Sequence, residues 1–171
     1  MNPLKSDEYP VSWEQYIEVV NKDPKEVLKT QLNSFPEFLT SIPPEKAEYS
    51  YAEGKWTIKE VIGHVIDTER IMAYRALCFA RNDTQSLPGY DDELFVQNAH
   101  FNDYSLEHYA EEFTLLRKSN ILLIESFNAT ELLRSGLANE RLVSVRALIY
   151  MIAGHLAHHR NIIQDRYLDN I

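Results

Sequence analysis

Cysteine is almost absent from the sequence, which contains only Cys78. A single cysteine cannot form an intramolecular disulfide, so the chain is not a small domain held together by disulfide bonds. This cysteine usage agrees with a reducing compartment, and we expect a cytoplasmic protein. Cys78 itself is expected to be a buried structural thiol.

Long apolar runs and clusters of basic residues are missing as well. The best apolar run, Ala147–Ala153, is far too short to span a bilayer, and the N-terminus has no apolar stretch of the signal-peptide kind. The 17 lysine and arginine residues are scattered among 26 acidic ones, which gives a formal net charge of −9. Nucleic-acid binders need clustered basic side chains. We therefore expect neither a membrane nor a nucleic-acid partner.

Helical periodicity dominates what the sequence does contain. Apolar residues recur at helical spacing in four segments, and almost nothing is typical of a strand. The expected helices cover residues 24–41, 57–81 and 106–127, and a fourth helix begins near residue 144. A short additional helix is expected at residues 13–20.

Two of these helices begin with clear capping signals. Asp23 is a suitable N-cap because Pro24 follows it at the first helical position. Thr57 and Glu60 form a capping box, in which the hydroxyl and the carboxylate accept hydrogen bonds from backbone N–H groups that the helix leaves unpaired.

The helices and their connections indicate an all-α protein of one domain. A chain of 171 residues, 44% of them hydrophobic, is long enough to bury one full core. We expect this single domain to cover residues 1–171, with an N-terminal arm at 1–22 and a four-helix bundle at 23–168. The stretch Asn82–Tyr104 is unusually long for a connection, which indicates either a functional loop or a segment that crosses the bundle from end to end.

Three histidines could meet at one metal ion. His155 and His159 are four residues apart, so on a helix they differ by about 40° around the axis and about 6 Å along it, and they project from one face. His64, on a facing helix, would supply the third imidazole. Three neutral imidazoles suit zinc, nickel or iron and leave a coordination position open for water or substrate. The alternative is that these histidines bind no metal, because histidines four residues apart occur on many helices without one.

Two neighbouring residues are candidates for catalytic roles. Asp67, three residues after His64, could accept a hydrogen bond from a ligand imidazole, accept a proton or reach the metal. It could equally belong to the polar face of its helix. His158 lies about 60° around the helix from His155, so we expect it at the rim of the site rather than among the ligands.

Five motifs follow one another between residues 56 and 159: Trp56-Thr57-x-x-Glu60-Val61-x-Gly63-His64-x-x-Asp67-x-Glu69-Arg70, Tyr74-Arg75-Ala76, Ala80-Arg81, Pro88-Gly89-Tyr90-Asp91 and Ala153-Gly154-His155-x-x-His158-His159. In order and spacing they resemble the DinB-like superfamily, and within it the YfiT-like branch of metal-dependent hydrolases. The resemblance covers about residues 24–167. One departure follows the paired histidines, where many relatives have Arg-Gly-Gln and this chain has Arg160-Asn161-Ile162. The departure affects inferred substrate contacts and leaves the histidines unchanged.

The resemblance implies a four-helix bundle with a long crossover connection. It also implies a divalent metal held by one histidine of the second helix and two of the fourth, which are His64, His155 and His159 in this sequence. The implied partner is a small-molecule substrate, and a homodimer is compatible with the family. Relatives include hydrolases, transferases that use low-molecular-weight thiols such as bacillithiol, mycothiol or glutathione, and thiol-dependent isomerases.

Three functions stay open. The first hypothesis is a thiol S-transferase, in which the metal lowers the pKa of a thiol co-substrate and presents the thiolate to an electrophile. The second is a metal-dependent hydrolase, in which activated water attacks an ester or amide and Asp67 or His158 accepts a proton. The third is a non-catalytic bundle that binds a metal or small ligand without turnover.

Overall fold

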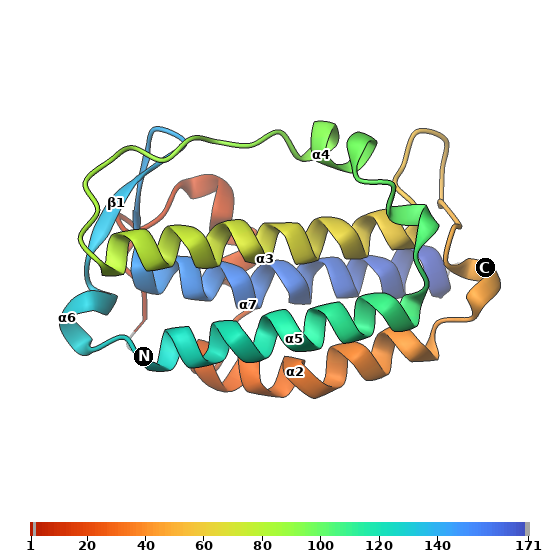
Figure 1. Ribbon diagram of the computed structural model, residues 1–171, viewed down its shortest axis with the longest axis horizontal. Helices are drawn as coiled ribbons and strands as arrows, with labels where there is room; N and C mark the ends of the chain where they lie inside the picture. Colours follow the sequence, from red (N-terminus) through yellow and green to blue (C-terminus); the bar gives the residue numbers. More distant parts are fainter. Residues whose placement is uncertain (2, 170–171) are drawn as a thin grey trace.

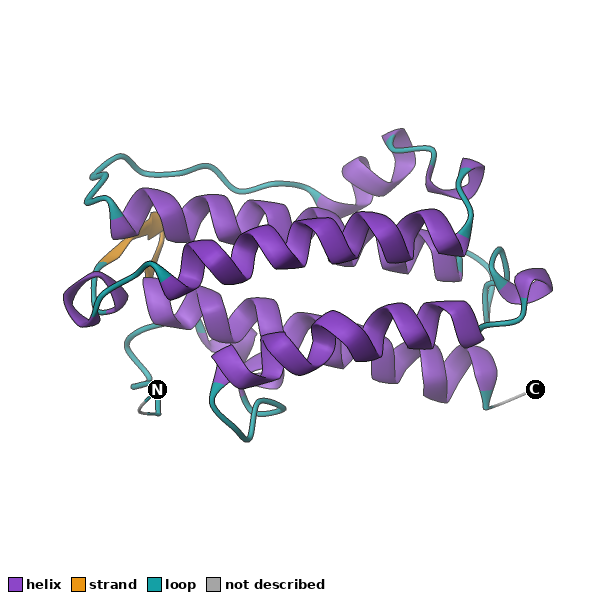
Figure 2. Cartoon of the chain, turned by 60° about the horizontal axis from the view of Figure 1, so that its bottom comes forward, coloured by secondary structure: helices purple, strands orange, loops and turns teal. Residues whose placement is uncertain are grey.

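A computed structural model describes residues 1 and 3–169, and within these residues four long helices form a bundle (Figures 1 and 2). The long helices are α2 (Pro24–Ser41), α3 (Ile58–Ala80), α5 (Leu106–Glu125) and α7 (Val145–Ile162). α2 packs against α5, and α3 packs against α7. The predicted all-α bundle is confirmed. No described helix combines the length and the apolar character that a membrane span requires.

The connection between α3 and α5 is the predicted long crossover. Both helices run in the same direction, opposite to α2 and α7 (Figure 1). Residues 81–105 therefore return along the length of α3 before α5 begins. This segment contains the short helix α4 (Asp92–Asn98) and the 3-10 turn η3 (Phe101–Asp103).

The predicted caps are present at the starts of α2 and α3. The Asp23 carboxylate accepts a hydrogen bond from the backbone N–H of Lys25 at 2.9 Å. The Thr57 hydroxyl accepts from the N–H of Glu60 at 3.1 Å, and the Glu60 carboxylate accepts from the N–H of Thr57 at 2.7 Å. Because these bonds involve residues within one turn, they could be read from the sequence.

A β-hairpin between α5 and α7 corrects the expectation that the chain has almost no strand. After the short helix α6 (Ala129–Leu132), strand β1 (Ser135–Ala138) pairs antiparallel with β2 (Arg141–Ser144). The turn residues Asn139 and Glu140 have φ values of 50° and 61°. Two-residue turns with positive φ favour Asn-Gly, so glutamate at the second position hides the signal. Strands of four residues are also too short to show a clear alternation.

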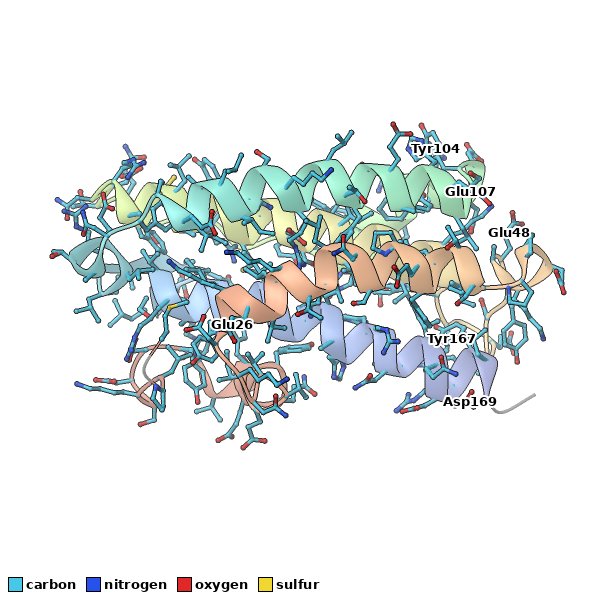
Figure 3. The ribbon with its side chains drawn as sticks, turned by 90° about the horizontal axis from the view of Figure 1, so that it is seen from below. Glu26, Glu48, Tyr104, Glu107, Tyr167 and Asp169 are labelled. Atoms are coloured by element: carbon cyan, nitrogen blue, oxygen red, sulfur yellow. The ribbon has the colours of Figure 1, made fainter. Side chains whose placement is uncertain are left out.

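Each end of the chain packs against the bundle. The N-terminal arm forms a 3-10 turn, η1 (Val11–Trp13), and the helix α1 (Glu14–Ile17), which contacts α7 and is shorter than the predicted helix at 13–20. The 3-10 turn η2 (Pro44–Lys46) follows the end of α2. Near the C-terminus, the π-helical segment η4 (Ile163–Leu168) follows α7. Tyr167 lies in this last segment (Figure 3), and its hydroxyl donates to the carbonyl of Trp56 at 2.8 Å.

A buried polar network separates two apolar clusters of the core. Arg117 of α5 is 0% exposed and donates to both carboxylate oxygens of Glu69 at 2.8 Å. Arg117 also donates to the side-chain oxygen of Gln31, which in turn donates to the carbonyl of Ala153, both at 2.8 Å. Asn120 donates to Glu69 at 3.1 Å. The network thereby links α2, α3, α5 and α7.

Candidate metal centre

His64 of α3 meets His155 and His159 of α7 in one cluster. One ring nitrogen of each lies within 4.8 Å of the other two, and the Nε2 atoms of His64 and His155 are 3.1 Å apart. His64 and His155 are 6% and 4% exposed, and His159 is half-buried. With metal–nitrogen bonds of about 2.0–2.1 Å, a tetrahedral site holds its nitrogens about 3.3 Å apart. The donor set therefore fits a divalent ion after a small closure.

Glycine precedes two of the three histidines and lets other segments cross beside them. A Cβ atom at Gly154 would lie 1.8 Å from the carbonyl oxygen of Tyr16 in the N-terminal arm. A Cβ atom at Gly63 would lie 2.3 Å from the ring of Phe101 in the crossover. Since no side chain fits in either place, these glycines allow the arm to reach α7 and the crossover to reach α3 next to the cluster.

The three imidazoles are neutral at physiological pH. Burial lowers the pKa of His64 to about 4, although the charge of Asp92 opposes the shift. Burial and the neighbouring imidazoles lower the pKa of His159 to about 3, and they hold the pKa of His155 well below its usual range. Metal coordination requires neutral imidazole, so the cluster does not have to release protons before it binds an ion.

The metal-free protein should lose stability as the pH falls from about 6.5 to about 4. In the unfolded chain His64 takes up a proton near its ordinary pKa of 6.5, whereas in the folded chain its pKa is about 4. Between these values the unfolded state binds more protons, so acid favours unfolding. His64 alone should account for about 3 kcal/mol of the loss.

Urea unfolding of metal-free protein at pH 7, 5.5 and 4.5 measures this loss. His64→Gln is the control, because glutamine fills part of the same space and does not titrate. The variant should show a shallower decline with pH than the wild type, since carboxyl groups that titrate in both proteins cancel in the comparison. Equal declines would show that His64 is not buried in its neutral form.

A cavity of about 910 Å³ opens onto the histidine cluster. The N-terminal arm, α3, the crossover, the hairpin and α7 all contribute to its wall, and His64 and His155 belong to the wall as well. Its charged lining residues are Arg75, Arg141 and Asp92. Pockets for small organic ligands have volumes of about 300–1,000 Å³, so this cavity is large enough for such a ligand beside the imidazoles.

Asp67 and His158 lie outside the cluster, and neither lines the cavity. The carboxylate of Asp67 accepts from Arg70 at 3.1 Å, and Arg70 also contacts Glu112 of α5 at 2.6 Å. None of the hydrogen bonds of Asp67 reaches a ligand imidazole, because a residue three positions on points about 60° away around the helix. Asp67 therefore lies on the polar face of its helix, which was the alternative to a role beside the imidazoles. His158 packs its ring edge-on against Tyr16, with 4.9 Å between centroids.

Asp92, the first residue of α4, is the acidic residue that the sequence interpretation missed. It lines the cavity together with His64. Its charge opposes the lowering of the His64 pKa by burial, and it adds to the raised pKa that burial gives Tyr16 and Tyr90. The signal in the sequence was its place directly after the motif Pro88–Asp91. Only the return of the crossover along α3 brings this carboxylate to the site.

Comparison with known proteins agrees with the fold. YfiT from Bacillus subtilis, described as a probable metal-dependent hydrolase with an unusual four-helix bundle topology, superimposes with a TM-score of 0.70 at 14% identity, over 96% of this chain and 90% of YfiT. At this identity the likeness concerns the fold alone. A protein of Oceanobacillus iheyensis named "Putative metal-dependent hydrolase OB0413" is 28% identical over 69 residues, so the match spans only 40% of the length of each protein.

The family assignment rests on a longer match. The sequence profile of the DinB superfamily matches residues 28–163. This range is well over half of the chain and includes His64, His155 and His159. The chain therefore belongs to the DinB superfamily.

Proposed function

We propose that this chain is a divalent-metal-dependent enzyme that acts on a small molecule in the cavity beside His64 and His155. The observation that carries the proposal is the contact between a cluster of three neutral imidazoles and a cavity of about 910 Å³. His64, His155 and His159 would hold zinc, nickel or iron(II). When bound, such an ion supplies Lewis acidity, which lowers the pKa of a water or thiol placed against it.

The reaction we propose is the transfer of a low-molecular-weight thiol to an electrophile. The cavity is near the upper end of the usual range for ligand pockets of about 300–1,000 Å³, which leaves room for two small molecules. No cysteine lines it among the described residues. Cys78 is only partly buried, which corrects the expected buried thiol, and it lies elsewhere on α3. The sulfur nucleophile would therefore arrive with a ligand.

The chain's own residues supply the rest of the transfer. Asp92 lines the same wall as His64 and would accept the proton of the thiol. The sulfur of the thiolate would form a bond to the electrophilic carbon of the second substrate. The bond from this carbon to its leaving group would break at the same time, and the leaving group would take the electron pair. Tyr16 and Trp56 cover the imidazoles, with ring centroids 5.3 Å from His155 and 4.9 Å from His64, and limit the access of water.

Hydrolysis of an ester or amide is the second candidate. The observation that favours it is the same carboxylate, because Asp92 could accept a proton from attacking water. Both relatives are also described as metal-dependent hydrolases. In this reaction Asp92 takes the part that the sequence interpretation gave to Asp67 or His158.

Purified protein loaded with Zn²⁺ or Ni²⁺ should conjugate a bromobimane electrophile to at least one of bacillithiol, mycothiol and glutathione. Metal-free protein should show only the uncatalysed rate. Asp92→Asn should lower turnover by about 10²- to 10⁴-fold with metal binding retained, because a positioned proton acceptor contributes that much. Asp67→Asn is the matched carboxylate control on α3, and its effect should be small.

A parallel screen of esters and amides separates the two reactions. Cleavage without any thiol conjugation would overturn the transferase and leave the hydrolase. Protein that binds metal at micromolar concentration and turns over nothing in either screen would be the non-catalytic bundle.

A further inference from the structure

Arg75 of α3 is a buried cation without a carboxylate partner among the described residues. It is 5% exposed, and its hydrogen bonds go to the carbonyl of Pro88 at 2.8 Å and to the sulfur of Met72 at 3.8 Å. Burial lowers the pKa of Arg75, and only the phenol of Tyr90, whose ring centroid lies 6.0 Å from the guanidinium carbon, opposes this effect; no carboxylate does so. The other two arginines that are buried in the described chain do have carboxylate partners: Arg117 pairs with Glu69, and Arg146 with Glu8.

An unpaired buried charge is unfavourable for folding, so its presence in a cavity wall calls for a ligand of opposite sign. The charges around Arg75 support the same conclusion. The whole chain carries −9, yet the charged residues of the cavity wall are two arginines, Arg75 and Arg141, and one acid, Asp92. One excess positive charge matches a singly charged carboxylate better than a phosphate dianion.

The guanidinium of Arg75 is directed along α3 toward the histidine cluster. Arg75 follows His64 by eleven positions, so the two share a helix face and lie about 16 Å apart along the axis. Helical side chains lean toward the N-terminus of their helix. The contact with Met72, one turn earlier, shows this direction for Arg75. The guanidinium is therefore about 12 Å from His64 along the axis.

We propose that Arg75 binds a carboxylate of the substrate and thereby holds the reacting end of the same molecule at His64 and His155. The planar fork of arginine offers two parallel N–H donors to a carboxylate, which fixes orientation as well as position. The substrate class is a small molecule with a carboxylate at one end and a thiol, an electrophilic carbon or a scissile ester or amide at the other. The two ends lie roughly 12 Å apart. The inference rests on the proposed function only for the place of the reacting end.

Chain length and charge of the ligand test the inference. Metal-loaded protein is titrated by calorimetry with 3-mercaptopropanoate and 8-mercaptooctanoate, and with the alcohols of the same lengths. 8-Mercaptooctanoate should bind at least tenfold more tightly than 8-mercaptooctanol, and added salt should reduce this preference. The three-carbon pair should show no such preference, because it cannot reach from the cluster to Arg75. Tighter binding of 8-mercaptooctyl phosphate than of the carboxylate would overturn the carboxylate assignment.

Variants test whether the preference for the carboxylate over the alcohol depends on Arg75. Arg75→Gln should lose it, and Arg75→Lys should keep only part of it, because lysine is shorter and lacks the fork. Arg81→Gln is the control, since Arg81 is an exposed arginine at the end of the same helix and pairs with Glu131. Arg75→Gln should melt no lower than the wild type, because an unpaired buried charge has been removed. A preference that survives in Arg75→Gln would overturn the inference.

A measurement without metal separates this inference from the proposed function. Octanoate should raise the melting temperature of metal-free wild-type protein and leave that of Arg75→Gln unchanged. If thiols bind to the metal-loaded protein with no preference for a carboxylate, the role of Arg75 is wrong and the metal site stands. If octanoate acts through Arg75 but no divalent ion binds, the proposed function is wrong and the anion site stands.

Discussion

Replacing His155 with alanine should abolish micromolar binding of Zn²⁺ and Ni²⁺. His155 is buried, its Nε2 lies 3.1 Å from that of His64, and among the described residues no other side chain completes the cluster. Loss of a group that only orients a ligand costs about 10- to 100-fold in metal affinity. Loss of the ligand itself should therefore cost more than about 100-fold. Calorimetric titration of metal-free protein measures the affinity.

His158→Ala is the matched control for this prediction. It removes an imidazole from the same helix, three residues away, whose ring packs against Tyr16 instead of joining the cluster. Its affinity for both ions should stay close to that of the wild type, and circular dichroism should show both variants folded. Equal losses of affinity in the two variants would place His158 among the ligands and contradict the assignment.

Replacing Glu69 with alanine should destabilise the protein by about 3–5 kcal/mol. Arg117 is 0% exposed and depends on Glu69 for both of its paired hydrogen bonds. Without the carboxylate, the guanidinium becomes an uncompensated buried charge, and the penalty for leaving it is larger than the value of the ion pair itself. Urea unfolding at pH 7 measures the free energy of unfolding.

Two further variants test the cause of this loss. Glu69→Ala combined with Arg117→Leu should recover part of the stability, because neither charge is then left unpaired. Glu112→Ala removes a carboxylate from the half-exposed pair with Arg70 and should cost less than about 1 kcal/mol. A cost for Glu69→Ala as small as that of Glu112→Ala would show that the network contributes little to stability.

The sequence predicted best those features whose causes lie within a few residues. The capping box of Thr57 and Glu60 and the cap at Asp23 were predicted and are confirmed, because a cap depends on side chains within one turn of the backbone that they satisfy. The pairing of His155 with His159 also follows from spacing. His64 is 91 positions from His155, so helical periodicity alone could not place it beside that pair; it was predicted as the third imidazole on a facing helix, and the family resemblance supported the same set.

Features that depend on distant contacts were missed or misplaced. The hairpin gave no signal because its turn has glutamate where glycine is favoured, and Asp67 was placed near the imidazoles by proximity in sequence alone. Asp92 and Arg75 reach the cavity through the course of the crossover and the packing of α3 against α7. The metal itself, its ligands and the proposed reaction stay predictions that the variants above test.

The sequence by itself determined four helices, the caps of two of them and a pair of histidines on one helix face, because hydrogen bonds and periodicity within a helix involve near neighbours. The tertiary structure brings His64 of α3 to that pair, and it alone decided which other side chains surround the cluster. A helix face acquires its surroundings only when other segments pack on it, and here glycines at 63 and 154 allow the crossover and the arm to pack close to the histidines. That packing places Asp92 and Arg75 in the cavity wall and leaves Asp67 outside it.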